Sequence, residues 1–385
     1  MDFDLTEEQR AFRTVVRAFA DDVIAPGAGE RDERHAFPLD EVRAMADLGL
    51  FGLPFPAAYG GADAGSVMTC IALEELGRVD QSVAITLSAA VGLGGAMISR
   101  FGSDAQKDRW LPALAAGETI ASFALTEPGG GTDAADAATT ATEVGDGWRI
   151  DGAKAFITNA GTPITAVHVV TAASEPDGGA AGLSSFLVPA GADGLRVETP
   201  YRKMSWRASD TRGLAFEGCR VDADALLGVR GRGFPQCLEV LTEARITIAA
   251  LAVGLAQSCL EASVTYATER TAFGRPIGAN QAIAMKVADM RVAVETARLA
   301  TYRAAWLADT GRPHVAEASL AKLVASEAAV DAAREAVQIH GGLGVMEESP
   351  LARAYRDAKV LEIGEGTNEI HRLILARDVG LPVTF

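Results

Sequence analysis

The spacing of apolar residues divides this 385-residue chain into three stretches, and that division limits its fold more than any other feature. Residues 1–120 and 231–385 repeat apolar side chains at helical intervals, whereas residues 121–230 hold short β-prone runs between Gly, Asp and Pro clusters. Helices on either side of a block of strands are typical of an α+β protein. We therefore predict an N-terminal α-helical domain, a central antiparallel β domain and a C-terminal helical bundle.

Individual elements follow from the same periodicities. The segment Thr6-Glu7-Glu8-Gln9 has the capping-box pattern, which predicts that the first helix begins directly after Thr6. Helical spacing predicts further helices over residues 39–48, 66–79, 80–101, 104–116, 233–270, 279–310 and 314–340. Strands are predicted over residues 121–125, 148–150, 153–158, 167–171, 185–188 and 214–216.

Bulk properties exclude some classes of function. The chain is 49% hydrophobic and 22% charged, so a large core can form, and its net charge of −16 argues against a nucleic-acid partner. The acidic N-terminus does not fit a signal peptide, and the longest apolar run, residues 246–256, is too short to span a membrane. The cysteines lack Cys-x-x-Cys spacing, which fits a cytoplasmic protein without disulfides or a metal site; they are Cys70, Cys219, Cys237 and Cys259.

One acidic residue near the C-terminus is a candidate for catalysis. Glu365 lies between Gly364 and Gly366, after an apolar run and before a predicted helix. Flanking glycines let the backbone approach a ligand closely, and a carboxyl group in an apolar pocket has a raised pKa and can act as a general base. The alternative is an ordinary turn with a solvated acid.

The surrounding segment resembles the catalytic segment of the acyl-CoA dehydrogenase family. Tyr-Arg-Asp-Ala-Lys at residues 355–359 is followed by Glu-Gly-Thr-Asn-Glu-Ile at residues 365–370, and further motifs follow the family's order along the whole chain. The resemblance implies a helical domain, a central antiparallel β domain and a C-terminal four-helix bundle. It also implies FAD-dependent α,β-dehydrogenation of an acyl-CoA to the trans-2-enoyl-CoA. Glu365 would take the α proton, and the β hydrogen would leave as hydride to flavin N5.

Two segments resemble the family's flavin-binding elements. Residues 123–133, Phe-Ala-Leu-Thr-Glu-Pro-Gly-Gly-Gly-Thr-Asp, leave a strand and enter a glycine-rich loop, which alone would also suit a mobile surface loop. Residues 154–161, Lys-Ala-Phe-Ile-Thr-Asn-Ala-Gly, read as a strand entering a turn. The resemblance assigns to FAD the residues Phe123, Leu125, Thr126, Gly131, Thr132, Phe156, Ile157 and Thr158. Many relatives carry Trp where this chain has Phe156, which removes one N–H donor.

Further cofactor contacts are expected from the C-terminal part. Arg270 follows a long helix, and an arginine there can simply complement the helix dipole. The motif Arg-x-x-Phe-Gly at residues 270–274 resembles the segment with which the family holds the FAD pyrophosphate of a neighbouring subunit. The resemblance therefore implies a homotetramer, a dimer of dimers, in which FAD is also bound by Arg270, Phe273, Asn280, Gln281, Gln338, Ile339, Gly341 and Gly342.

Substrate contacts are assigned by the same resemblance. Arg245 lies in an apolar helix and needs an acceptor, which would be a core carboxylate or the active site. Some family branches carry the base directly before this Arg, but that residue here is Ala244, so Glu365 is the expected base. The acyl-CoA would contact Thr132, Thr242, Arg245, Gly366 and Arg377. Thr367 and Glu369 would contact FAD, and Ser205 replaces a Gly in a segment between domains.

Several alternatives remain at the level of sequence. An acyl-CoA oxidase or flavin monooxygenase on the same fold would reoxidise rapidly in air, and a non-catalytic acyl-CoA-binding subunit would lack the flavin's yellow colour. An electron-transfer flavoprotein is the acceptor that the resemblance implies. Residues 86–95 should form the floor of the acyl cavity, and their small side chains leave room for a medium or branched chain unless the backbone fills the space.

Overall fold

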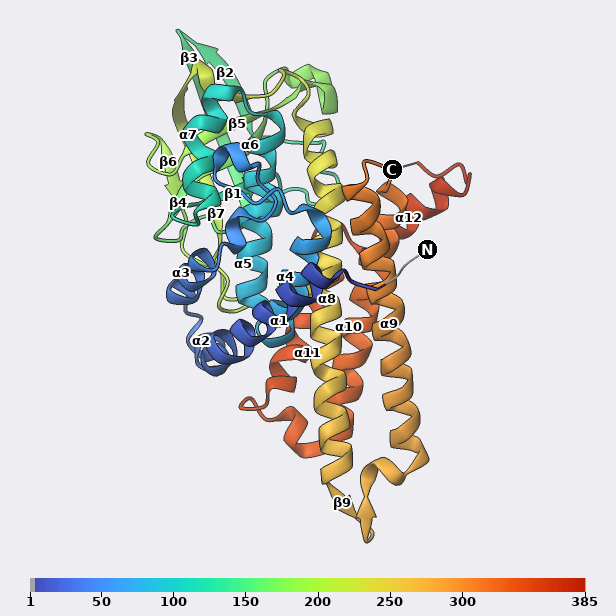
Figure 1. Ribbon diagram of the computed structural model, residues 1–385. Helices are drawn as coiled ribbons and strands as arrows, with labels where there is room; N and C mark the ends of the chain where they lie inside the picture. The colour runs from blue at the N-terminus through green and yellow to red at the C-terminus, as the bar shows by residue number, and fades with distance from the viewer. Residues whose placement is uncertain (1–3, 385) are drawn as a thin grey trace.

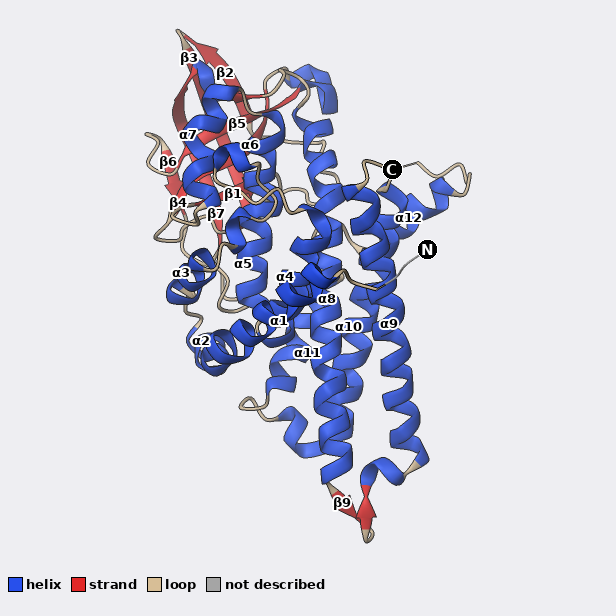
Figure 2. Cartoon of the chain, viewed as in Figure 1, coloured by secondary structure: helices blue, strands red, loops and turns tan. Residues whose placement is uncertain are grey.

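The computed structural model describes residues 4–384, and along the chain a strand-rich part separates two helical parts (Figures 1 and 2). The strands gather at the upper left of Figure 2, whereas long helices make up the lower and right-hand part. The N-terminal helices are α1 (Glu7–Phe19), α2 (Ala28–Arg34), α3 (Leu39–Asp47), α4 (Gly65–Val79), α5 (Gln81–Ala89), α6 (Gly95–Phe101) and α7 (Asp104–Ala115).

Local sequence signals explain where these helices begin. The predicted capping box is present at α1, because the Thr6 side chain accepts from the Gln9 N–H and the Gln9 side chain accepts from the Thr6 N–H. The Asp80 carboxylate accepts from the N–H groups of Ser82 and Val83, which satisfies the first turn of α5. The segment predicted as one helix over residues 80–101 is α5 and α6, joined by a π-helical turn, η5 (Ala90–Gly94).

One helical stretch within residues 4–384 has the length and apolar composition of a membrane span. It covers Gln81–Phe101, and 83% of its apolar window is buried inside the fold. Such burial is typical of a helix in a protein core. Its apolar character is therefore explained by packing against the neighbouring elements.

The central sheet contains β1 (Ile120–Ala124), β2 (Thr140–Val144), β3 (Gly147–Thr158), β4 (Thr165–Ala173), β5 (Leu183–Pro189), β6 (Leu195–Val197), β7 (Thr211–Asp222) and β8 (Leu226–Leu227). The strand order is β6-β7-β3-β2-β4-β5-β8, and β1 pairs with β4. Most pairs are antiparallel as predicted, but β1 runs parallel to β4, and β2 meets β4 in parallel at one position. The parallel pairing is allowed because a long excursion through β2 and β3 separates β1 from β4.

The C-terminal part contains α8 (Gly233–Glu269), α9 (Gln281–Asp309), α10 (Val315–His340), α11 (Pro350–Leu361) and α12 (Asn368–Asp378). A short hairpin of β9 (Thr271–Ala272) and β10 (Arg275–Pro276) joins α8 to α9 and projects from one end of the bundle (Figure 1). The long helices agree with the predicted ranges to within two residues at each end.

The N-terminal helices and the bundle share one hydrophobic core, whereas most of the sheet encloses a second core around Phe186, Ile150 and Phe216. Close backbone contact joins the two helical parts. A Cβ atom on Gly254 of α8 would lie 2.2 Å from the carbonyl oxygen of Glu74 in α4, so only glycine permits this approach. The divisions at residues 120 and 230 remain predictions.

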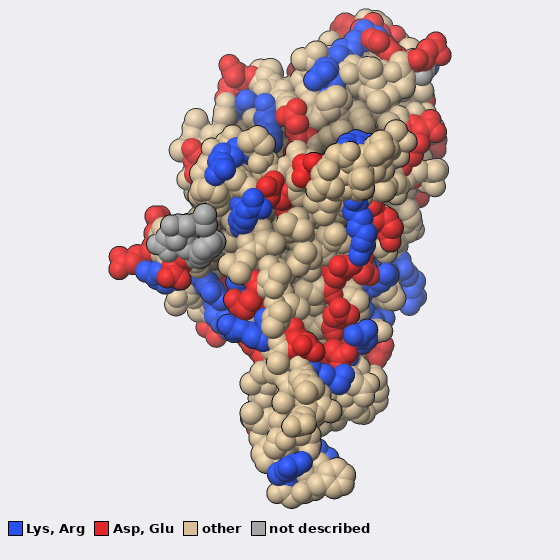
Figure 3. Space-filling model, turned by 90° about the vertical axis from the view of Figure 1, so that its right-hand side faces the viewer, with Lys and Arg blue, Asp and Glu red and all other residues tan. Residues whose placement is uncertain are grey.

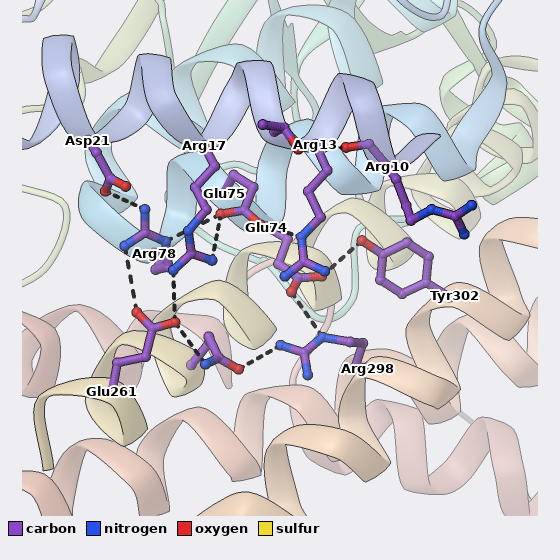
Figure 4. Close-up of polar contacts among 12 residues, drawn as sticks. Arg10, Arg13, Arg17, Asp21, Glu74, Glu75, Arg78, Glu261, Arg298 and Tyr302 are labelled. Carbon is purple, nitrogen blue, oxygen red and sulfur yellow. Dashed lines mark hydrogen bonds and ion pairs between the residues drawn. The ribbon is translucent and has the colours of Figure 1, made fainter. Parts of the chain in front are cut away.

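A buried network of charges also fastens α1 and α4 to the bundle (Figure 4). Both carboxylates at its centre are almost inaccessible to solvent. Glu75 accepts from Arg13 of α1 at 2.7 Å, and Glu74 accepts from Arg298 of α9 at 3.0 Å and from the Tyr302 hydroxyl at 2.9 Å. Because each buried charge has partners, the network avoids the large cost of an unpaired ion in the core.

Candidate active site

Glu365 lies in the short loop between α11 and α12, and its backbone is strained. Its φ angle is +51°, in the left-handed region that disfavours residues with a side chain. Gly366 has a φ of +101°, and a Cβ atom there would lie 3.2 Å from Nε2 of His371. The backbone conformation of Gly366 thus favours glycine, and a side chain there would also press on His371.

The environment of Glu365 suits a general base. Burial raises the pKa of its carboxyl group to about 7, although the charges of Lys322 and Arg245 act to lower it. A carboxyl group with this pKa is poised between its protonated and ionised forms near neutral pH. The side chain is half-buried in the described chain, so the carboxylate is neither sealed in the core nor solvated on a helix face.

Arg245 and Thr242 lie on α8 and are both buried. The Nε atom of Arg245 has no hydrogen-bond partner among residues 4–384, while Glu365 is the group whose charge acts on its guanidinium. The sequence left open whether a core carboxylate or the active site would supply the acceptor that this arginine needs. In the structure it lies close enough to Glu365 for each charge to influence the other.

The glycine-rich loop after β1 is anchored by a buried ion pair. Lys154 of β3 donates to Oε1 of Glu127 at 2.7 Å and to the Leu125 carbonyl at 3.0 Å. Glu127 also accepts from the N–H groups of Ala138 and Thr139, at 2.7 and 3.1 Å. Burial alone would raise the pKa of Glu127, but the Lys154 ammonium outweighs it and holds that pKa below its ordinary value. The loop is thus fixed at its base and is not a mobile surface segment.

The predicted flavin residues fall into two groups by exposure. Leu125 and Ile157 are buried and support the strands, whereas Phe123, Thr126 and Thr158 are partly exposed. Gly131 and Thr132 lie on the open part of the loop and are exposed.

Phe156 combines an exposed aromatic ring with an unfavourable backbone conformation. The side chain of Phe156 is 66% exposed, and its ring contacts that of Tyr201 at 5.3 Å between centroids. The backbone φ angle of Phe156 is +61°, which is unfavourable for a residue with a side chain. Seven non-glycine residues among residues 4–384 have positive φ, and five of them fall in the segments singled out from the sequence: Phe156, Asn159, Trp206, Phe273 and Glu365. Such strain gathers at functional sites, where surrounding structure or a ligand supports it.

A third group of predicted residues lies at the far end of the bundle. Arg270 and Phe273 belong to the hairpin region at the bottom of Figure 1, and the Phe273 side chain is 99% exposed. The His340 ring stacks on Tyr266 with 4.2 Å between centroids, which places the turn after α10 beside the same end of α8. Asn280 and Gln281 begin α9 nearby, and Gln338, Gly341 and Gly342 are exposed while Ile339 is buried.

These residues cannot meet Glu365 within one chain. In Figure 1 the hairpin lies at the bottom of the bundle, whereas α12 lies beside its upper part. The sequence-predicted site is therefore divided between two places in the protomer.

The expected floor of the acyl cavity is filled by the fold. A Cβ atom on Gly94 would lie 2.8 Å from that of Ala121, and one on Gly95 would lie 2.5 Å from Cζ of Phe55. These glycines therefore allow close packing and leave no added room for an acyl chain. Only Gly92 is partly open, 3.8 Å from Oγ1 of Thr247 at its virtual Cβ position. The backbone at residues 94 and 95 is thus packed closely against Ala121 and Phe55.

The remaining predicted residues have mainly structural contacts. The Thr367 hydroxyl accepts from the Ile370 N–H and caps α12, while Glu369 is exposed in its first turn. Arg377 donates to the Val383 carbonyl at 3.0 Å. The Ser205 hydroxyl, where the family has Gly, donates to the Arg356 carbonyl of α11, so this substitution adds a contact between parts of the chain.

The residues present fit a flavin cofactor. An exposed aromatic ring held by strained backbone offers a flat surface, and the anchored loop offers the hydroxyl of Thr126 and open backbone at Gly129, where a Cβ atom would meet nothing within 4 Å. The carboxyl group of Glu365 then supplies the titratable group that such a site needs for proton abstraction.

Comparison with known families gives the class of protein. The N-terminal, middle and C-terminal domains of acyl-CoA dehydrogenases match residues 6–118, 122–219 and 231–380. The chain therefore belongs to the acyl-CoA dehydrogenase family and is an FAD-binding oxidoreductase. The predicted α+β architecture and cofactor are thereby confirmed.

Individual relatives match over almost the whole chain. A probable acyl-CoA dehydrogenase of Bacillus subtilis is 44% identical over 98% of this chain and 100% of its own length. The mitochondrial short-chain specific acyl-CoA dehydrogenase of Homo sapiens is 42% identical over 97% of this chain and 90% of its own. The butyryl-CoA dehydrogenase structure from Megasphaera elsdenii superposes with a TM-score of 0.95, at 37% identity, covering 98% and 100% of the two chains.

A further solved chain bears on the electron acceptor. It comes from a structure named for the electron transferring flavoprotein of Acidaminococcus fermentans and matches with a TM-score of 0.96 at 39% identity. The match covers 99% of this chain and 100% of that one.

Three contributors to the site were not predicted from the sequence. Lys322 of α10 and His371 of α12 lie fully buried beside the Glu365 loop, and the Lys154–Glu127 pair anchors the glycine-rich loop. A lysine in an otherwise apolar face of a helix was the available signal for Lys322, because such a residue needs a buried partner. The pairing of Lys154 with Glu127 could not be predicted, because the two residues lie on different segments and no local sequence pattern links them.

Proposed function

We propose that this protein oxidises a short-chain acyl-CoA to the trans-2-enoyl-CoA, with Glu365 as the base that removes the α proton. The observation that carries the proposal is a loop carboxyl group whose pKa burial raises to about 7, close enough to Lys322 and Arg245 for their charges to act on it. When bound, FAD accepts the β hydrogen as a hydride. A carboxylate is a weak base for a C–H bond, and a partly desolvated one is better matched to that task.

The polypeptide has three tasks in this reaction. Glu365 holds the proton that leaves the α carbon, at its carboxylate oxygen. The anchored loop at residues 123–132 and the exposed ring of Phe156 would hold the flavin, while Thr132, Thr242 and Arg245 would orient the acyl-CoA. Donors aimed at the thioester carbonyl stabilise the negative charge that develops there, and one such donor contributes about 3 kcal/mol.

The short acyl chain is supported by two observations. The relatives that match over nearly the whole chain include enzymes named as short-chain specific or butyryl-CoA dehydrogenases. In addition, the glycines of the expected cavity floor are packed against Ala121 and Phe55. A rigid, filled floor disfavours a long chain, because extra methylene groups would require neighbouring residues to move.

The base is tested by Glu365→Gln, with flavin reduction by butyryl-CoA followed as loss of absorbance under anaerobic conditions. We expect the variant to keep FAD and to lose at least about 10²–10⁴-fold in rate, the usual contribution of a positioned base. Glu362→Gln is the matched control, because Glu362 lies three residues earlier and pairs with Lys359 instead. A Glu365→Gln rate within about tenfold of the wild type would exclude Glu365 as the base.

Assembly as a homotetramer, a dimer of dimers, belongs to the same proposal. An exposed apolar row runs along α9 at intervals of seven residues and consists of Met285, Val292, Leu299 and Trp306. Figure 3 shows that the end of the bundle near the hairpin carries few charges. Such a surface is typical of a protein–protein interface, and a partner seated there would bring Arg270 and the turn after α10 to a second active site. Light scattering of the purified flavoprotein tests this: a monomeric mass would refute it.

Two further parts of the proposal concern the acceptor and the compartment. An electron-transfer flavoprotein is the proposed oxidant, supported by the similarity to the Acidaminococcus fermentans chain. Rapid reoxidation of the reduced enzyme by air would instead indicate an oxidase. A cytoplasmic location is supported by four free, buried cysteines.

A further inference from the structure

Lys322 is a fully buried cation that the proposed reaction does not use. Its side chain lies on α10 with 0% of its surface exposed. None of the ion pairs among residues 4–384 involves it. A buried ammonium group without a carboxylate partner is unfavourable for folding, so the groups that surround it must offset that cost.

The contacts of Lys322 all lead to the Glu365 loop. Its Nζ donates to the Gly366 carbonyl at 2.8 Å and to Oδ1 of Asn368 at 3.0 Å. The Ser326 hydroxyl, one turn along α10, donates to the same Oδ1 at 3.0 Å. One ammonium group thus fixes the residue directly after Glu365 and the first residue of α12.

This anchorage falls where the backbone needs it. Glu365 is held at a φ of +51° and Gly366 at +101°, and a non-glycine residue in this region is unfavourable by about 1–2 kcal/mol unless its surroundings hold it. A hydrogen bond from a charged donor is about twice as strong as a neutral one, so Lys322 is the strongest polar anchor of the loop.

Titratable groups face Glu365 from three helices, and two of them are charged near neutral pH. Lys322 approaches from α10 and Arg245 from α8, and each acts to lower the pKa of the carboxyl group. His371 of α12 is buried with both ring nitrogens unpartnered, and burial lowers its pKa to about 3, so it carries no charge near neutral pH. Burial also lowers the pKa of Lys322 to about 8, against the opposing effects of Glu365, Glu362 and Glu369.

We infer that Lys322 is a positioning residue of the active site, which holds Glu365 in its left-handed conformation through Gly366 and Asn368 and stabilises the ionised carboxylate by its charge. The inference rests on the proposed role of Glu365 as the base. Lys322 would act through the loop, because its hydrogen bonds go to Gly366 and Asn368.

The pH profile of flavin reduction by butyryl-CoA separates this role from simple packing. The rate should rise with pH as the Glu365 carboxyl group ionises, and this rise is the limb assigned to Glu365. Lys322→Met removes the positive charge and should move that limb to higher pH by about one unit, because a nearby opposite charge lowers the pKa of a carboxyl group by about 1–3 units. Lys322→Arg keeps the charge but alters the hydrogen bonds, so the rate should fall while the limb stays in place. Ser326→Ala is the matched control, because it removes a donor to the same Asn368 oxygen without removing charge.

A second measurement does not depend on activity. A double-mutant cycle of Lys322→Met and Glu365→Gln, read as the urea midpoint of the purified flavoprotein, should show coupling near about pH 7.5, where Glu365 is mostly ionised. The coupling should disappear near about pH 5.5, where the carboxyl group is protonated.

The outcomes distinguish two failures. If Glu365→Gln still reduces its flavin at nearly the wild-type rate, the proposed base is wrong. If Glu365→Gln is inactive but Lys322→Met lowers the rate equally at every pH and shows no coupling, only the inference about Lys322 is overturned. A shifted limb together with pH-dependent coupling supports it.

Discussion

Replacing the proposed base should make the protein more stable at neutral and alkaline pH. The pKa of the Glu365 carboxyl group rises from its ordinary 4.5 to about 7 because burial disfavours the ionised form. At about 1.4 kcal/mol per pH unit, that difference corresponds to about 3 kcal/mol, an upper value because the side chain is only half-buried. Glu365→Gln keeps the shape of the protonated acid and carries no charge, so it avoids this cost.

The sign follows from proton linkage. A carboxyl group whose folded-state pKa is raised contributes its full stability below its unfolded pKa of 4.5 and loses it as pH rises through about 7. Wild type and Glu365→Gln should therefore unfold at similar urea concentrations near about pH 4.5 and diverge up to about pH 8. Over the window from about pH 6 to 8, the wild-type rate of flavin reduction should rise about tenfold as the base ionises.

Urea titrations followed by circular dichroism at several pH values measure this effect, and Glu369→Gln is the matched control. Glu369 lies four residues further on in the exposed first turn of α12, and its pKa is lowered through hydrogen bonds from its own backbone N–H and from Thr367. Its replacement should therefore not stabilise the protein at pH 8. If Glu365→Gln is no more stable than the wild type at every pH, the carboxyl group is not desolvated as described.

Three further variants test other parts of the structure. Lys154→Met should destabilise by about 3–5 kcal/mol, because it leaves Glu127 as an unpaired buried charge, and should release FAD; full flavin content would contradict the anchoring role. Gly254→Ala should lower the free energy of unfolding by about 1–3 kcal/mol through overlap with α4, whereas Gly29→Ala in α2, with nothing within 4 Å, should leave it unchanged or raise it slightly, as measured by urea titration. Arg270→Ala should lower flavin content after gel filtration if subunits share the site, and unchanged content would contradict that arrangement.

The sequence predicted the elements whose signals are local. The capping box at Thr6, the long apolar helices and the glycine-flanked Glu365 each depend on spacing within a few residues, and each is present in the structure. Specific motifs carried the assignment further, because they occur in the family's order over the whole chain. The fold and the family were therefore predictable from the sequence alone.

The features that were not predicted depend on contacts between distant residues. The parallel pairing of β1 with β4 joins strands about forty residues apart, and no local pattern distinguishes it from an antiparallel pair. The charge network of Glu74 and Glu75 draws arginines from α1 and α9, which are far apart in the sequence. Gly94 and Gly95 pack against Ala121 and Phe55. These neighbours are distant in the sequence, so the close packing could not be predicted from it.

The loop that carries Glu365 combines several features that each oppose folding. Its backbone is left-handed at a residue with a side chain, its carboxyl group is desolvated, and a lysine without an ion-pair partner is buried beneath it. Together these would be unfavourable by several kcal/mol, which is a large part of the 5–15 kcal/mol that a typical domain has in total. A loop selected only for stability would not accumulate them at one place. Each feature instead contributes to holding a carboxylate of suitable pKa at a fixed position, so stabilising substitutions in this loop should be the ones that reduce turnover.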